Sequence, residues 1–144
     1  MTGLFPGSFD PFTIGHKDIA DRALRLVDKL IIAVGVNEQK ACMLTADERL
    51  AQIRKVYEGD SRVEVVQFNG LTMDFAREHD CGCIIKGVRS VKDFEYEREQ
   101  ADMNLQVGGI ETAILYCRPE FASVSSSLVR TFKYFGKDYK QFLP

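Results

Sequence analysis

The chain has 144 residues, 45% of them hydrophobic and 28% charged, which is typical of one soluble globular domain with a hydrophobic core. Its formal net charge is −2, which excludes a global positive field for nucleic acid or for an anionic membrane surface. An anionic substrate would therefore have to be bound by a local cluster of positive groups.

The beginning of the chain lacks the basic region and apolar run of a signal peptide. The most apolar segment, residues 29–36, is too short to cross a bilayer. We therefore expect a cytoplasmic protein consisting of a single domain, 1–144, without nucleic-acid or membrane partners.

Segments typical of strands and helices alternate along the chain. In chain order, the pattern predicts a strand at 3–7, a helix at 17–27, a strand at 29–36, a helix at 44–59, a strand at 62–68, a helix at 71–80, a strand at 81–88, a helix at 93–107, a strand at 112–117 and a helix at 125–135. The alternation predicts an α/β fold: a Rossmann-like, doubly wound, five-stranded parallel sheet with helices on both faces. Ligands of such sheets bind beyond the carboxyl ends of the strands.

Helical spacing also predicts which side chains face the core. The expected buried residues are Ala20, Ala23, Leu24 and Val27 in the first helix, Ala46, Leu50, Ile53 and Tyr57 in the second, and Phe94, Ala101 and Leu105 in the fourth. Thr45 and Glu48 have the spacing of a capping box at the start of the second helix.

The segment PGSFDPFTIGH, residues 6–16, joins the first strand to the first helix. Gly7 allows a tight turn, and Asp10 before a proline can accept local backbone N–H groups. Gly15 begins the helix, where free N–H groups and the helix dipole favour a phosphate, and His16 can donate to that same phosphate. On its own, the segment is equally compatible with a tight turn closed by a capping histidine. The dinucleotide fingerprint G-x-G-x-x-G and the phosphate-loop ending G-K-[ST] are both absent from the sequence.

Residues 13–16, TIGH, resemble the T/H-x-G-H motif of the nucleotidylyltransferase superfamily. Within that superfamily the chain resembles the phosphopantetheine adenylyltransferases. Further blocks match in order: LTADERL at 44–50, IIKGVRSVKDFEYE at 84–97, ADMN at 101–104 and SVSSSLVR at 123–130.

This resemblance implies transfer of the adenylyl group of ATP to 4′-phosphopantetheine, giving dephospho-coenzyme A and pyrophosphate in coenzyme A biosynthesis. It implies direct attack of the acceptor phosphate on the α-phosphate, without a covalent enzyme intermediate. Mg²⁺ would be bound mainly through the ATP phosphates and by no protein side chain. The family is typically a homohexamer, and coenzyme A is a plausible feedback inhibitor because it contains both half-substrates.

The resemblance also implies roles for individual residues. The implied catalytic residues are His16, Lys40 and Lys86. The implied ATP-binding residues are Ser8, Phe9, His16, Gly87, Val88, Arg89, Glu97, Phe121, Ala122, Ser123, Val124, Ser125, Ser126 and Ser127. The implied binding residues for 4′-phosphopantetheine are Ser8, Lys40, Thr72 and Lys86. The chain departs from the family at Ser8, usually threonine, and at Lys86, usually arginine, which loses a two-pronged grip on phosphate.

The chemistry of the residues agrees with these roles. A phosphate monoester is already a good nucleophile, so catalysis rests on alignment and on neutralising negative charge. Two alternatives remain at this point: a related cytidylyl- or adenylyltransferase with another acceptor, and a nucleotide-binding regulatory module without catalysis. The combination of His16, Lys40 and Lys86 argues against the second alternative, because sensing would not need all three.

Cysteines and C-terminal aromatic residues fall outside these motifs. Cys81 and Cys83 have no second pair of Cys or His at usable spacing, so we favour buried reduced thiols over a metal site for the four cysteines. The C-terminal aromatic residues carry too much apolar area for a free tail, and we expect them to pack on the domain or to form a subunit contact. They are Phe132, Tyr134, Phe135, Tyr139 and Phe142.

Overall fold

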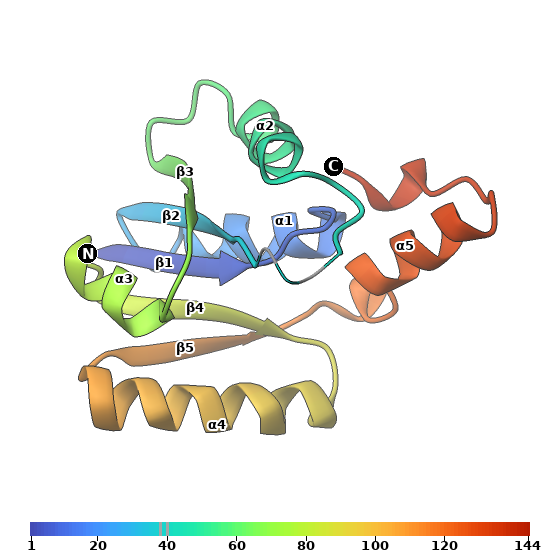
Figure 1. Ribbon diagram of the computed structural model, residues 1–144. Helices are drawn as coiled ribbons and strands as arrows, with labels where there is room; N and C mark the ends of the chain where they lie inside the picture. Colours follow the sequence, from blue (N-terminus) through green and yellow to red (C-terminus); the bar gives the residue numbers. More distant parts are fainter. Residues whose placement is uncertain (38, 40) are drawn as a thin grey trace.

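Five parallel strands form one sheet in the order β3–β2–β1–β4–β5 (Figure 1). The computed structural model describes residues 1–37, 39 and 41–144. The strands are β1 (Thr2–Gly7), β2 (Lys29–Gly35), β3 (Val63–Phe68), β4 (Cys83–Val88) and β5 (Glu111–Tyr116). The helices are α1 (Ile14–Ala23), α2 (Ala46–Val56), α3 (Thr72–Glu78), α4 (Val91–Gly108) and α5 (Ser126–Tyr134), with 3₁₀ turns at Pro119–Phe121 and Lys140–Phe142. The expected α/β fold is confirmed.

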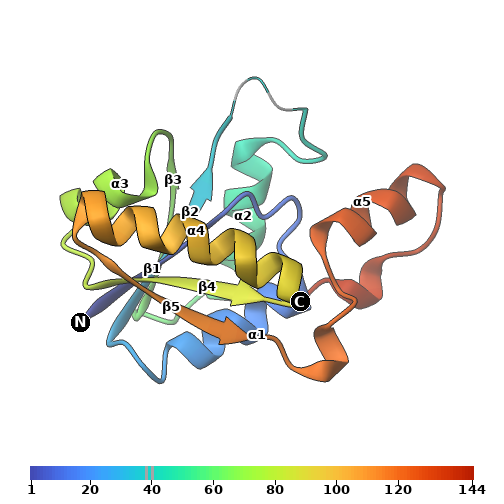
Figure 2. The ribbon, with the colours of Figure 1, turned by 90° about the horizontal axis from the view of Figure 1, so that it is seen from below.

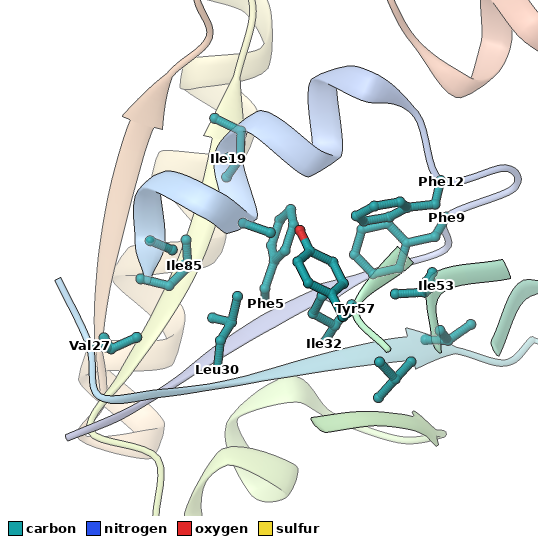
Figure 3. Packing of buried hydrophobic residues seen from close by; sticks show 14 of the residues in the cluster. Phe5, Phe9, Phe12, Ile19, Val27, Leu30, Ile32, Ile53, Tyr57 and Ile85 are labelled. Atoms are coloured by element: carbon teal, nitrogen blue, oxygen red, sulfur yellow. The ribbon is translucent and has the colours of Figure 1, made fainter. Parts of the chain in front are cut away.

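Alternate residues of the buried strands supply the two cores on either side of the sheet. Leu30, Ile32 and Val34 of β2 pack with α1 and α2, and Figure 3 shows part of this cluster around Phe5 and Ile53. Their neighbours Ile31 and Ala33 pack on the other face, against α3. A run of apolar residues is therefore required in β2, because both faces of a central parallel strand are covered.

The strand order reverses direction at β1, which has β2 on one side and β4 on the other. Helix α5 lies beyond the carboxyl ends of the strands, next to the ends of β4 and β5 (Figures 1 and 2). This is the edge of an open α/β sheet at which ligands bind. No helix in the described ranges is long and apolar enough to span a membrane.

Helix α1 is shorter than the spacing predicts. It ends at Ala23, and the N–H groups of Arg25 and Leu26 then bond the carbonyls three residues back, which tightens the chain into a turn. Val27 is nonetheless buried, because the turn directs it under β1 against Gly3. The expected burial of Val27 is thus correct although its place in the helix is wrong.

The expected inner face of α4 is wrong at Leu105, whose side chain is 44% exposed. Asn104 is buried instead. Consecutive helix residues point about 100° apart, and α4 directs Asn104 rather than Leu105 toward the protein. The buried amide of Asn104 lines a cavity described below, which explains why an apolar side chain is not needed there.

Candidate active site

A cavity of about 470 Å³ opens beyond the carboxyl ends of β1 and β4. Its lining comes from the end of β1, the loop into α1, the end of β4, the first turns of α4 and the N-terminus of α5. A second cavity of about 250 Å³ lies between the end of β4, α3 and α4. Both cavities are lined by Pro6, Lys86, Tyr96 and Glu97. The two spaces therefore meet at the end of β4.

His16 is held at the start of α1 by the residue that caps the helix. The Thr13 hydroxyl accepts from the backbone N–H of His16 at 3.3 Å, and the backbone N–H of Thr13 donates to His16 Nδ1 at 3.0 Å. A histidine thus completes the reciprocal capping box that glutamate usually completes. Because Nδ1 accepts a hydrogen bond, the proton of the neutral ring is carried by Nε2.

The surroundings keep this ring neutral. Burial, together with the positive charges of Arg89 and Lys86, lowers the pKa of His16 from 6.5 to about 4. A neutral imidazole with Nε2–H is a hydrogen-bond donor at pH 7 that does not titrate there. His16 lines the larger cavity, so it can donate to an oxygen bound in it.

Helix α2 anchors the loop that precedes His16. The guanidinium of Arg49, which is buried, donates to the carbonyls of Ser8 at 2.7 Å and Gly35 at 3.0 Å. One turn further on, the Gln52 side chain accepts from the backbone N–H of Phe12 at 3.1 Å and donates to its carbonyl at 3.0 Å. These bonds satisfy backbone groups that would otherwise lie buried without partners.

Asp10 does not accept the local N–H groups that its position before a proline suggested. Its carboxylate accepts instead from the backbone of Met43 at 2.8 Å and Leu44 at 2.7 Å, more than thirty residues away. The carbonyl of Asp10 accepts from Arg130 of α5 at 2.9 Å. The loop is therefore tied both to the segment that precedes α2 and to α5.

The Phe9 side chain forms part of the cavity wall through its ring. Its backbone has a φ of 49°, uncommon outside glycine, and its ring packs edge-on against Phe5, Phe12 and His16. A Cβ on Gly7 would lie 2.8 Å from this ring, so glycine is required at the end of β1. Packing around the ring keeps the unusual backbone conformation in place.

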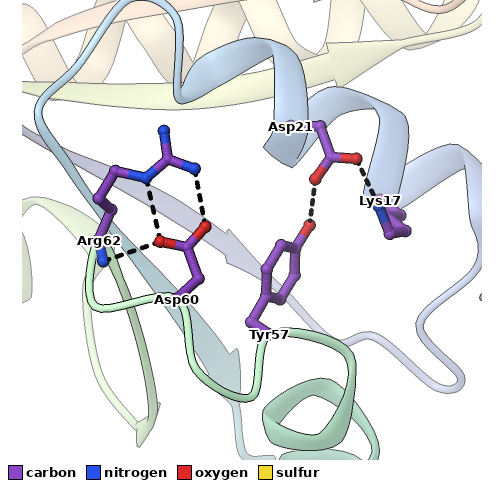
Figure 4. Close-up of polar contacts among 5 residues, drawn as sticks. All are labelled: Lys17, Asp21, Tyr57, Asp60 and Arg62. Carbon is purple, nitrogen blue, oxygen red and sulfur yellow. Dashed lines mark hydrogen bonds and ion pairs between the residues drawn. The ribbon is translucent and has the colours of Figure 1, made fainter.

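Helix α1 is also linked to the end of α2. The Tyr57 hydroxyl donates to Asp21 at 3.0 Å, and Lys17 binds the same carboxylate (Figure 4). Burial and the adjacent Asp21 raise the pKa of Tyr57, so the phenol stays protonated and keeps this bond. The Asp60–Arg62 pair in the same view lies on the loop before β3.

Positive groups lie on the opposite side of the larger cavity and are paired with carboxylates of α4. Lys86 Nζ lies 3.2 Å from Glu97 Oε2, with side chains that are 26% and 15% exposed. Arg89 Nε lies 3.5 Å from Asp93 Oδ2 and its side chain is 42% exposed. These cations can bind an anionic ligand, provided that the ligand competes with the carboxylates.

The N-terminus of α5 closes the remaining side. The hydroxyl of Ser125 accepts from the N–H of Leu128, that of Ser126 donates to the carbonyl of Pro11 at 2.8 Å, and that of Ser127 accepts from Arg130. The Ser126 O–H is thus engaged with the protein, whereas the Ser125 and Ser127 hydroxyls act only as acceptors in these bonds and keep their own O–H donors. Free backbone N–H groups, the O–H groups of Ser125 and Ser127, and the positive end of the helix dipole are therefore available to an anion here.

Most of the predicted site residues lie around the two cavities. The predicted residues lining the larger cavity are Phe9, His16, Lys86, Gly87, Val88, Arg89, Glu97, Phe121, Val124, Ser125, Ser126 and Ser127. Thr72 lines the smaller cavity with Lys86 and Glu97. Within the described part of the chain, Ser8, Ala122 and Ser123 line neither of the two, and Lys40 lies outside the described residues.

Sequence reasoning missed Tyr96 and Lys92 as lining residues and Arg49 as an anchor. For Arg49 a signal existed: it lies three residues after Ala46 and four before Ile53, which puts a cation on the apolar face of α2. Among residues 1–37, 39 and 41–144, no group of three His, Cys, Asp or Glu side chains could hold a metal ion. The expected burial of the cysteines is correct for Cys83 but wrong for Cys42, which is exposed because it lies in the loop before α2. Burial raises the pKa of the Cys81 and Cys83 thiols, so these thiols stay protonated.

Comparison with known proteins first identifies the class. The cytidylyltransferase-like family model matches residues 4–132. A bifunctional NMN adenylyltransferase/ADP ribose pyrophosphatase from Francisella tularensis has a similar fold, with a TM-score of 0.71 at 17% identity over 99% of this chain and 44% of that one. A lipopolysaccharide core biosynthesis protein from Thermoplasma volcanium is similar over 82% of this chain and 96% of that one, with a TM-score of 0.58 and 21% identity. The fold is that of nucleotidyltransferases.

Curated relatives then identify the family. The phosphopantetheine adenylyltransferase of Phocaeicola vulgatus is 45% identical over 141 residues, which cover 98% of this chain and 93% of that protein. The enzyme of the same name from Symbiobacterium thermophilum is 44% identical over 96% of this chain and 86% of its own. The chain belongs to the phosphopantetheine adenylyltransferase family, and the expected family and enzyme class are confirmed.

Proposed function

We propose that the protein transfers the adenylyl group of ATP to 4′-phosphopantetheine, producing dephospho-coenzyme A and pyrophosphate in coenzyme A biosynthesis. The observation that carries this proposal is the meeting of two cavities at Lys86. ATP would occupy the larger cavity, with its phosphates near His16 and the N-terminus of α5. The acceptor would occupy the smaller cavity, with its arm along Thr72 and its phosphate at Lys86.

The reaction needs no nucleophile from the protein. An oxygen of the acceptor phosphate supplies the electron pair that forms the new bond to the α-phosphorus, while the bond from that phosphorus to the bridging oxygen breaks. Pyrophosphate leaves with the electron pair of the broken bond. Because charge is spread over the transferring group, donors positioned in advance contribute most of the catalysis. His16 Nε2–H is proposed to donate to an α-phosphate oxygen, and Lys86 and Arg89 to neutralise the phosphates around it.

Mg²⁺ is proposed to arrive on the phosphates of ATP. Magnesium sites in nucleotide enzymes commonly use substrate phosphates with one or two carboxylates, and the carboxylates at this site are occupied by Lys86 and Arg89. The cation would reduce repulsion between the two anionic substrates. Lys40 is proposed, from family resemblance alone, to contact phosphates of both substrates.

The assembly and the regulation of the protein are also proposed from family resemblance. A homohexamer in the cytoplasm is proposed from this resemblance. A subunit contact is supported by Tyr134 and Phe135, which are 84% and 69% exposed and contact each other edge to face. Phe132 and Phe142, by contrast, pack together within the chain. Coenzyme A is proposed to inhibit by occupying both cavities. Native mass spectrometry and inhibition kinetics test these two points.

Pyrophosphate release tests the reaction. With Mg²⁺, ATP and 4′-phosphopantetheine, we expect turnover that stops when CTP replaces ATP or when the acceptor lacks its phosphate. Single in-line displacement also predicts inversion at phosphorus when the α-phosphate of ATP is replaced by a chiral thiophosphate. Turnover with another acceptor would favour a related transferase, and binding of ATP without turnover would favour a regulatory module.

A further inference from the structure

The ion pair between Lys86 and Glu97 stands where the two cavities meet. Each of its members lines both cavities, and the Nζ–Oε2 distance is 3.2 Å. Glu97 Oε2 is fully buried and has no hydrogen bond from any described residue, so the charge of Lys86 is the partner that compensates it. A ligand that removes Lys86 from this pair therefore leaves a buried carboxylate without a partner.

A phosphate that enters the smaller cavity would remove Lys86 from its pair with Glu97. A phosphate dianion competes with Glu97 for the same ammonium group, and it then lies close to a carboxylate of like charge. A buried charge that loses its partner is strongly disfavoured, and repulsion by the incoming dianion adds to this cost. Acceptor binding to the free protein is therefore opposed by Glu97.

A ligand in the larger cavity can remove that opposition. An ionised carboxylate only accepts hydrogen bonds, and the ribose of a nucleotide carries two hydroxyl donors. Hydroxyls that bond Glu97 would compensate its charge and leave Lys86 free to bind the acceptor phosphate.

We propose that the Lys86–Glu97 pair couples the two cavities, so that a nucleotide in the larger cavity strengthens binding of a phosphate monoester in the smaller one. The coupling rests on the proposed function for the identity of the two ligands. It is reciprocal, because the factor by which the nucleotide raises acceptor affinity must equal the factor by which the acceptor raises nucleotide affinity. Glu97 acts here as a positioning residue for Lys86.

Calorimetric titrations measure this coupling without turnover. The ligands are 4′-phosphopantetheine and the α,β-methylene analogue of ATP with Mg²⁺, each titrated alone and in the presence of the other. We expect each ligand to lower the Kd of the other by about fivefold or more. In Glu97→Gln the factor should fall to about one, while binding of 4′-phosphopantetheine alone becomes as tight or tighter because the opposing charge is gone.

Two further titrations separate coupling from a folding defect. The 2′,3′-dideoxy form of the same ATP analogue, titrated with the unaltered protein, should bind without strengthening acceptor binding. Glu99→Gln, an exposed carboxylate further along the same helix, should keep the full factor.

A coupling factor near one in the unaltered protein, or the full factor in Glu97→Gln or with the dideoxy analogue, would overturn the proposal. Coupled binding without pyrophosphate release would leave the coupling in place and contradict the proposed function instead. Failure of 4′-phosphopantetheine to bind at all would contradict both.

Discussion

The wall formed by residues 8–16 is fixed by hydrogen bonds between the backbone and side chains that are buried or half-buried. The wall formed by residues 86–97 instead carries cations paired with carboxylates. In the first wall, Arg49 and Gln52 hold the loop, and Thr13 orients His16. In the second, Lys86 and Arg89 are paired with Glu97 and Asp93. The bonds of the first wall do not compete with a ligand, but those of the second do.

This difference separates two tasks. Donors that are positioned before the reaction and need not rearrange stabilise a transition state, whereas cations that exchange partners bind and release substrates. We therefore assign rate acceleration to the 8–16 wall and substrate affinity to the 86–97 wall. The kinetic variants His16→Ala and Lys86→Ala should each affect mainly one of these two properties, and the stability measurements test how the 8–16 wall is held in place.

The largest effect is expected from His16→Ala. Loss of one positioned donor typically lowers kcat by about 10²–10³, and the affinity for ATP should change little because the remaining phosphate contacts stay. Steady-state kinetics and calorimetry of ATP binding measure the two quantities separately. Turnover within about threefold of the parent would show that His16 has no catalytic role.

Arg49→Met tests whether the 8–16 wall depends on its anchor. The variant keeps an unbranched apolar stem but leaves the carbonyls of Ser8 and Gly35 without their donor. We expect the free energy of unfolding to fall by about 3 kcal/mol. In denaturant titrations, the exposed Lys55→Met of the same helix serves as the matched control and should change stability by less than about 0.5 kcal/mol. Equal free energies of unfolding for the two variants would show that Arg49 does not anchor the 8–16 wall.

A smaller effect is expected in the 86–97 wall. Charge-assisted hydrogen bonds contribute about 1.5–3 kcal/mol, so Lys86→Ala should lower kcat/KM for the acceptor about 10- to 150-fold, and that for ATP less. Lys86→Arg should keep most of the activity, because it restores the usual residue of the family. Equal losses for both substrates would assign Lys86 to the nucleotide.

The acid stability of the protein should reflect His16. Its pKa of about 4 in the folded chain lies below the ordinary value of 6.5, so the unfolded chain binds a proton first as pH falls. The stability contributed by the neutral ring is fully present above pH 6.5 and is lost as pH falls to about 4. We expect a loss of about 1–3 kcal/mol, and a flatter profile for His16→Asn. Identical profiles in denaturant titrations would contradict the lowered pKa.

The sequence predicts the parts of this arrangement that depend on local patterns. Alternating strands and helices predict the sheet, and the place of Gly15 and His16 after the first strand predicts that the ring lies at a helix N-terminus. Long-range bonds are different: nothing near Asp10 indicates that it binds the backbone at Met43. The position of Arg49 on the apolar face of α2 indicates burial, but not that Arg49 reaches Ser8. Such contacts depend on how the loops approach one another at the edge of the sheet.

The sequence also does not predict which charged side chains form ion pairs with one another. Family resemblance assigns Lys86 to the acceptor and Glu97 to the nucleotide, but only the cavities show that the two residues meet. The spacing of apolar residues in α4 is likewise insufficient, because it does not predict that Asn104 is buried and that its neighbour Leu105 is exposed.

The protonation state of His16 tests the central claim that the 8–16 wall supplies a neutral donor. Nitrogen NMR of the imidazole rings from about pH 3 to about pH 8 reports both the pKa and the nitrogen that carries the proton, and His79→Gln removes the only other histidine signals. We predict a neutral ring at pH 7 with the proton on Nε2, and a pKa close to 4. A ring that titrates near 6.5, or that carries its proton on Nδ1 when neutral, would contradict the account.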